Sequence, residues 1–134
     1  MNNQAYQKGN HPSAVISEDV MIGSETTIAA GAIIGAGVVI GDHCQIGTGV
    51  IIEANSRIEN NCVLEAGVII GRRVTLGKNT KIGIGARVTN GVTIGPDSVI
   101  KIGEIILKDM IYKMVFKRGA WIYREDSLNC KNED

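Results

Sequence analysis

The chain repeats every six residues from Ile16 to Ile106, and few backbones can accommodate such a period. Sixteen successive sixth positions carry Ile, Leu or Val, and thirteen of them are isoleucine. We call these sixth positions the leading positions. The residue two before each leading position is mostly small, and the residue after it is often glycine. In a strand, the leading residue and the residue two before it share a side, while the residue between them faces the other way. Each hexad is therefore predicted to be a short strand followed by a turn.

The apolar stretch "AGAIIGAGVVIG" at residues 30–41 could be a membrane helix, a glycine linker or part of the repeat. Its residues Ile34 and Ile40 fall on leading positions, which indicates two rungs of a solenoid. A membrane-spanning helix needs ~20 residues, and the uncharged run 26–41 is shorter. No membrane span is therefore predicted.

The charge and cysteine content limit which binding partners and which cellular compartment are expected. Lys plus Arg equals Asp plus Glu, at 14 each, so no nucleic-acid partner is predicted. The first residues show no signal-peptide pattern, and an odd number of cysteines, three, favours reduced thiols in the cytoplasm. Cys44 and Cys62 fall on inward positions without a third ligand nearby in the pattern, so they are predicted to fill the core, and no metal site is expected.

The unbroken hexads resemble the hexapeptide-repeat family, whose members fold as a left-handed parallel β-helix with three hexads in each triangular coil. General rules for crossovers favour the opposite hand, so the left-handed winding is what the resemblance implies. It implies an all-β fold of about five coils, with an extension at 1–12, the β-helix at 13–106 and an appendage at 107–134. The appendage is either an extended tail or a helix from about Leu107 to Arg118. The buried face of that helix would contain Met110, Ile111, Met114 and Val115.

One face of the predicted prism carries a nearly continuous apolar stripe on its outward positions, and the corner leading into this face is glycine in five successive coils. Exposed apolar stripes are typical of interfaces. The resemblance implies a homotrimer, and the alternative is that the chain's own C-terminal tail covers the stripe. The predicted interface residues are Val15, Ile33, Ile51, Ile69 and Ile105.

The segments "RIENNCVLEAGVIIG" and "KIGIGARVTNGVTIGPDSVIKIGEIILKDM" are similar to sequences of the nucleotide-sugar acyltransferases of this family. The resemblance implies transfer of an acyl group, expected to be acetyl, from acyl-coenzyme A to a sugar or a nucleotide-linked sugar. Acyl-coenzyme A would be a co-substrate, with no covalently bound cofactor. The alternative is a non-catalytic trimeric scaffold, because no loop interrupts the hexads and Lys101, Ile102 and Glu104 replace small residues of the family.

Acyl transfer commonly uses a histidine as general base, and the chain contains only His11 and His43. His11 precedes the first coil and is interpreted as structural. His43 is the candidate catalytic residue, although it stands one residue later than in the family's His-Asp-Cys arrangement. His43 also shares a corner position with Asn61 and Asn79, residue types that tolerate a positive φ. A turn role is therefore the second interpretation of His43.

The remaining site residues are what the resemblance implies. The candidates for binding the acceptor are Asn60, Asn61 and Glu65. The candidates for binding the cofactor are Gly85, Gly103 and Lys108. Five basic residues from Arg72 to Arg87 could attract phosphates. Their scatter around the perimeter favours a solvated surface instead.

Overall fold

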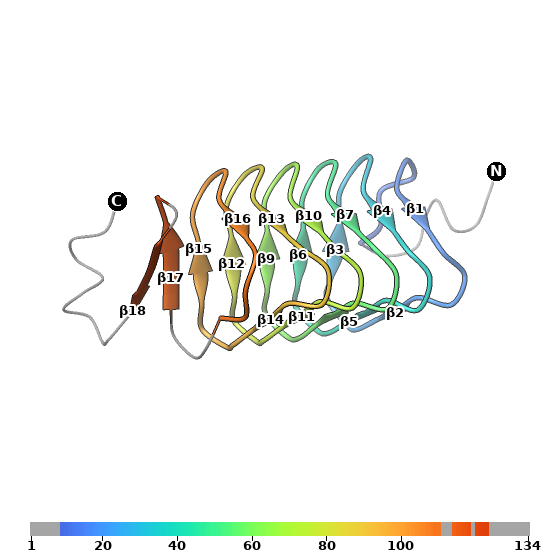
Figure 1. Ribbon diagram of the computed structural model, residues 1–134. Coiled ribbons are helices and arrows are strands. Elements are labelled where there is room, and N and C mark those ends of the chain that lie inside the picture. Colours follow the sequence, from blue (N-terminus) through green and yellow to red (C-terminus); the bar gives the residue numbers. More distant parts are fainter. Residues whose placement is uncertain (1–8, 111–113, 119, 124–134) are drawn as a thin grey trace.

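The computed structural model describes residues 9–110, 114–118 and 120–123, and within these residues the chain winds as a left-handed parallel β-helix (Figure 1). Every hexad forms a two-residue strand, and every corner between β1 and β16 is a two-residue turn. The predicted all-β fold of about five coils is confirmed. The strands of the coils are β1(Val15–Ile16), β2(Met21–Ile22), β3(Thr27–Ile28), β4(Ile33–Ile34), β5(Val39–Ile40), β6(Gln45–Ile46), β7(Ile51–Ile52), β8(Arg57–Ile58), β9(Val63–Leu64), β10(Ile69–Ile70), β11(Thr75–Leu76), β12(Lys81–Ile82), β13(Arg87–Val88), β14(Thr93–Ile94), β15(Val99–Ile100) and β16(Ile105–Ile106).

Three parallel sheets form the faces of the prism. The first face has the order β1-β4-β7-β10-β13-β16, the second β14-β11-β8-β5-β2, and the third contains β3, β6, β9, β12 and β15. Strands pair with the strand eighteen residues away, as Ile33 does with Ile51 and Ile51 with Ile69. Position along the sequence is therefore also position along the axis of the prism.

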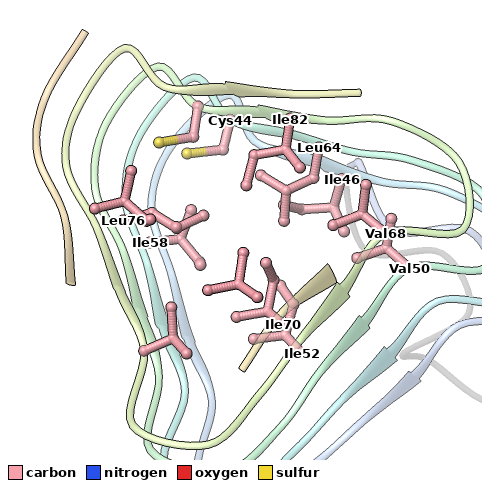
Figure 2. Packing of buried hydrophobic residues seen from close by; sticks show 14 of the residues in the cluster. Cys44, Ile46, Val50, Ile52, Ile58, Leu64, Val68, Ile70, Leu76 and Ile82 are labelled. Atoms are coloured by element: carbon pink, nitrogen blue, oxygen red, sulfur yellow. The ribbon is translucent and has the colours of Figure 1, made fainter. Parts of the chain in front are cut away.

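The leading residues fill the interior. Figure 2 shows Ile46, Ile52, Ile58 and Leu64 converging inside the triangle, each at most 1% exposed. Each such side chain contributes ~1.5–3 kcal/mol when buried, and stacking along the axis brings each one into contact with its equivalent in the next coil. The hexad pattern thus specifies the core directly.

The third face also buries a column of hydroxyl and thiol side chains. These groups donate hydrogen bonds to corner carbonyls, with Thr26 Oγ1 2.6 Å from Gly41 O, Cys44 Sγ 3.1 Å from Glu59 O and Cys62 Sγ 3.2 Å from Gly77 O. Both cysteines are free and lie in the core, as expected. The Cys44 side chain and burial together raise the pKa of the Cys62 thiol, so Cys62 stays protonated. The column consists of Thr26, Cys44, Cys62, Thr80 and Ser98.

Glycine serves two different purposes in the coils. Gly85 has φ near 71°, a left-handed conformation that glycine adopts without strain. Gly77 precedes a turn instead, and a Cβ there would lie 2.5 Å from Pro96 N of the next coil. The glycine that follows a leading residue is therefore needed for close stacking of the coils, not for its φ.

The C-terminal segment is extended. Strand β17(Met114–Lys117) pairs in parallel with β15, with Val99 opposite Val115, and β18(Ala120–Tyr123) returns antiparallel to β17. The alternative helix from Leu107 to Arg118 is wrong. The open edge of β15 offers backbone partners that a helix would leave unpaired, so the tail adds a strand to the third face. Ile111, assigned to that helix, lies outside the described residues.

The described residues contain no helix long and apolar enough to cross a membrane.

At the N-terminal end of the prism, backbone pairing begins before β1. Asn10 forms a bridge with Ile28, and the His11 backbone N–H donates to Ile28 O.

Candidate functional site

The corner that leads into the third face has more polar turn residues than the other two corners, and we call it the polar corner. Its second residue has a left-handed backbone in all five coils, with φ between 56° and 62°. Asparagine, aspartate and histidine occupy four of these five positions, in agreement with their tolerance of positive φ. The polar corner consists of Ser24–Glu25, Asp42–His43, Asn60–Asn61, Lys78–Asn79 and Pro96–Asp97.

Two side chains of the polar corner cap backbone groups of the preceding coil. Asp42 Oδ1 accepts a hydrogen bond from Ser24 N at 2.9 Å, and Asn60 Oδ1 accepts one from Asp42 N at 2.8 Å. The Asn60 side chain lies over Gly41, where a Cβ would overlap Oδ1. Asn90 caps Arg72 N in the same way at another corner, at 2.9 Å.

These caps follow a sequence signal that the hexad analysis missed. A glycine after a leading residue is followed nineteen residues later by Asp or Asn in three places. The glycine leaves space for the side chain that caps the coil beneath. The three pairs are Gly23 with Asp42, Gly41 with Asn60 and Gly71 with Asn90.

His43 lies in the second coil of the polar corner, and its side chain is exposed. Its φ is 56°, and its backbone N–H donates to Ser24 O at 2.9 Å. Glu25 and Asn61 occupy the same position one coil away on either side. The geometry therefore fits the turn role fully, and it leaves the imidazole accessible to a reactant.

The structure brings together only part of the predicted site. His43, Asn60 and Asn61 share the polar corner, whereas β9 separates Glu65 from Asn61. Glu65 lies instead at the corner that contains Gly85 and Gly103. A Cβ at either glycine would meet nothing within 4 Å, so this corner is open.

Lys108 lies beyond β16, next to Asp109, which accepts a hydrogen bond from Thr93 N at 2.9 Å. The predicted acceptor and cofactor residues thus occupy three different corners of one chain. Corners of different copies can face one another in a cyclic assembly, which is the arrangement that would unite these groups.

His11 has the structural role expected of it. Its Nδ1 accepts a hydrogen bond from Ser13 N at 3.0 Å and lies 2.9 Å from Ser13 Oγ. Ser13 Oγ in turn accepts one from Gly31 N at 3.0 Å. The imidazole thereby closes the first corner of the prism.

The basic residues are distributed around the prism. Arg72 lies 3.7 Å from Glu53, and Arg57 lies 3.9 Å from Glu59, in ion pairs whose side chains are 45–63% exposed. Pairs at this exposure contribute little to stability. Arg87 interrupts the apolar stripe on the first face, and Lys81 lies on the third face. Among the described residues no group of three His, Cys, Asp or Glu side chains could hold a metal ion.

Fold and hexad geometry define a β-helix built from transferase-type hexapeptide repeats. The family model described as "Hexapeptide repeat of succinyl-transferase" matches residues 14–54 and 67–108, and "Bacterial transferase hexapeptide (six repeats)" matches residues 37–72. The chain belongs to the hexapeptide-repeat transferase family. None of the curated protein sequences matches it.

Solved structures of acetyl- and acyltransferases are similar to the chain. The acetyltransferase domain of PglB from Neisseria gonorrhoeae has a TM-score of 0.78 at 20% identity, over 84% of this chain and 56% of that one. PerB from Caulobacter crescentus, solved with CoA and GDP-perosamine, has a TM-score of 0.61 at 32% identity over 84% of this chain and 56% of that one. The chain therefore spans little more than half the length of these two relatives.

AntD, an N-acyltransferase from Bacillus cereus solved with dTDP and 3-hydroxybutyryl-CoA, has a TM-score of 0.79 at 14% identity. That match covers 92% of this chain and 84% of AntD. At this identity, as for PglB, the likeness shows the shared β-helix fold.

Proposed function

We propose that the chain transfers an acyl group, acetyl in the simplest case, from acyl-coenzyme A to a sugar carried on a nucleotide. The family match over 14–54 and 67–108 supports an acyltransferase, and the 32% identity to PerB, with its bound CoA and GDP-perosamine, supports this pair of reactants. The observation that carries the proposal furthest is the polar corner, where His43, Asn60 and Asn61 meet on an exposed surface of a transferase-type coil.

In this reaction the acceptor nitrogen or oxygen forms a bond to the thioester carbonyl carbon. The carbon–sulfur bond breaks, and coenzyme A leaves as the thiolate. The proton lost by the acceptor protonates that thiolate, so the products are the acylated sugar and coenzyme A. A neutral sugar amine needs little help with deprotonation, whereas a hydroxyl acceptor would need a base such as His43.

The acceptor would bind at Asn60 and Asn61, with Glu65 contributing from the next corner. The cofactor would lie along the corner at Gly85 and Gly103, where the space beside the two glycines is open. Lys108 would pair with a phosphate of coenzyme A. Because these groups lie at different corners, we propose that the enzyme works as a homotrimer with each site between two copies.

The first face supplies the proposed interface. Val15, Ile33 and Ile105 are 62%, 45% and 54% exposed, and Ile51 and Ile69 are half-buried in the single chain. Aliphatic side chains at such exposure on one continuous face are typical of a contact with another copy. The free thiols Cys44 and Cys62 support a reducing compartment, the cytoplasm.

A non-catalytic trimeric scaffold is the second candidate function. The specific observation in its favour is that every corner in residues 12–103 is a two-residue turn, so this part of the chain has no loop to cover a neighbour's site.

A thermal-shift experiment with coenzyme A, acetyl-coenzyme A and a panel of nucleotide sugars separates the two functions. A ligand at 100 times its Kd stabilises the folded state by ~2.7 kcal/mol. The acyltransferase predicts a rise in Tm with acetyl-coenzyme A and with at least one nucleotide sugar. An unchanged Tm with all of them favours the scaffold.

A further inference from the structure

The orientation of the Asn60 carboxamide is determined by its own coil. Asn60 Oδ1 accepts the Asp42 backbone N–H at 2.8 Å. A flipped carboxamide would place Nδ2, which carries two hydrogens, against that N–H donor. The oxygen is therefore held against the backbone, and the nitrogen is the atom left for other contacts.

The Asn60 Nδ2 group has no hydrogen-bond partner among the described residues, and the side chain is exposed. It lies one coil after Asp42 in the polar corner, which also contains His43. A donor whose position is already set by a cap costs little ordering entropy when it binds a ligand. The corner thus presents a preorganised N–H donor.

We propose that Asn60 Nδ2 donates a hydrogen bond to an oxygen of the bound reactants. This assignment rests on the proposed acyltransferase function. The oxygen belongs either to the thioester carbonyl, which gains negative charge during transfer, or to a hydroxyl of the acceptor sugar.

Asp42 indicates how to test the assignment. An aspartate in this slot caps the preceding coil, as Asp42 does for Ser24 N at 2.9 Å, but it offers only acceptor oxygens. Asn60→Asp therefore keeps the cap and removes the donor. The double variant Asp42→Asn with Asn60→Asp keeps both caps and the net charge, because the two side chains merely exchange places. Asn90→Asp is the matched control, since Asn90 makes the same cap at a corner without His43.

The experiment measures acetyl transfer from acetyl-coenzyme A to GDP-, UDP- and dTDP-linked amino sugars, together with Tm and the side-chain amide NMR signals of Asn60 and Asn90. We expect near wild-type Tm for the exchanged variant and for Asn90→Asp. We expect activity to be lost in Asn60→Asp and in the exchanged variant and retained in Asn90→Asp. In the wild type, the ligand should shift the Asn60 amide signals and leave those of Asn90 unmoved.

The kinetic parameters distinguish the two candidate acceptors of the Asn60 hydrogen bond, the thioester oxygen and the sugar hydroxyl. Loss of a donor to the thioester oxygen lowers kcat by ~10²-fold or more with little change in KM. Loss of a donor to a sugar hydroxyl raises the KM for the acceptor by about tenfold. Wild-type activity in the folded exchanged variant, or an unmoved Asn60 amide while the ligand binds, overturns the donor role and leaves the proposed function intact. A wild type that neither binds nor turns over any of these ligands overturns both.

Discussion

At the residue scale, left-handed corner positions show how far backbone geometry explains the polar residues of the surface. His43, Asn61 and Asn79 have φ of 56°, 62° and 61°, and each donates its N–H to a carbonyl of the preceding coil. Their shared geometry accounts for residue type without reference to catalysis. A catalytic role of His43 would be additional to this turn role.

The variant His43→Asn tests which role matters. Asn61 occupies the same position one coil later, so we expect the variant to fold with an unchanged Tm. If His43 is only a turn residue, acyl transfer should stay within a few-fold of the wild type, and this is the result we expect. A general base would show a rate loss of ~10²–10⁴ at constant Tm, measured in the same transfer assay.

His43→Val is the control for that experiment. A β-branched side chain at φ 56° is strained whatever the chemistry of the site, so Tm should fall under either interpretation. An unchanged Tm for the valine variant would contradict the turn role itself.

The stacking glycines carry a separate prediction. In Gly77→Ala the new Cβ would lie 2.5 Å from Pro96 N, a backbone atom that cannot move without displacing the next coil. We expect a loss of ~1–3 kcal/mol in the free energy of unfolding, measured by urea denaturation. Gly49→Asn is the contrasting variant, because a Cβ at Gly49 meets nothing within 4 Å and asparagine tolerates its φ of 69°. Equal losses for the two variants would refute the stacking explanation.

At the element scale, the C-terminal hairpin ends the solenoid by a change of strand direction. Strand β17 extends the third face in parallel, and β18 reverses, as Figure 1 shows at the end of the prism. Glu104, on an inward position of the last coil, accepts a hydrogen bond from Arg118 N in the turn of the hairpin. The hairpin is thus tied both to the edge of β15 and to the end of the prism.

Val115→Asp tests this attachment. Val115 is fully buried in β17, which extends the third face, and an unpaired carboxylate there would be desolvated. We expect the hairpin to detach, with fast hydrogen exchange at the β17 amides and only a small fall in the Tm of the coils. Lys117→Asp, at a half-buried position of the same strand, is the control and should keep slow exchange. Slow exchange in Val115→Asp would show that the edge pairing alone holds the strand.

At the scale of the whole molecule, the first face decides the assembly. Ile51→Arg would bring three unpaired charges together in an apolar contact of the proposed trimer. Sedimentation should then show monomer or aggregate, while Thr75→Arg, on the second face, leaves the trimer intact. A monomeric wild type would refute the interface assignment outright. The domain limits at residues 12 and 106 also stay predictions.

The hexad pattern by itself determined the short strands, their turns and the inward side of each strand, because side chains alternate between the two sides of a strand. The β-helix was what the resemblance to the hexapeptide-repeat family implied. Ile46 and Ile58 could be placed in the core from their positions alone, and Asn61 and Asn79 could be assigned to left-handed turns. These are local consequences of period and residue type, so no distant contact was needed to predict them.

Only the tertiary structure decided the features that depend on contacts between residues far apart in the sequence. The spacing of Met110, Met114 and Val115 was compatible with a helix as well as with an extended tail, and the unpaired edge of β15 made the strand more favourable. Asn60 was an acceptor-binding candidate through the resemblance, and only the structure shows that its Oδ1 accepts a hydrogen bond from Asp42 N of the preceding coil. Glu65 stood four residues from Asn61 in sequence, yet the intervening strand β9 places it at another corner, because a prism turns at every hexad.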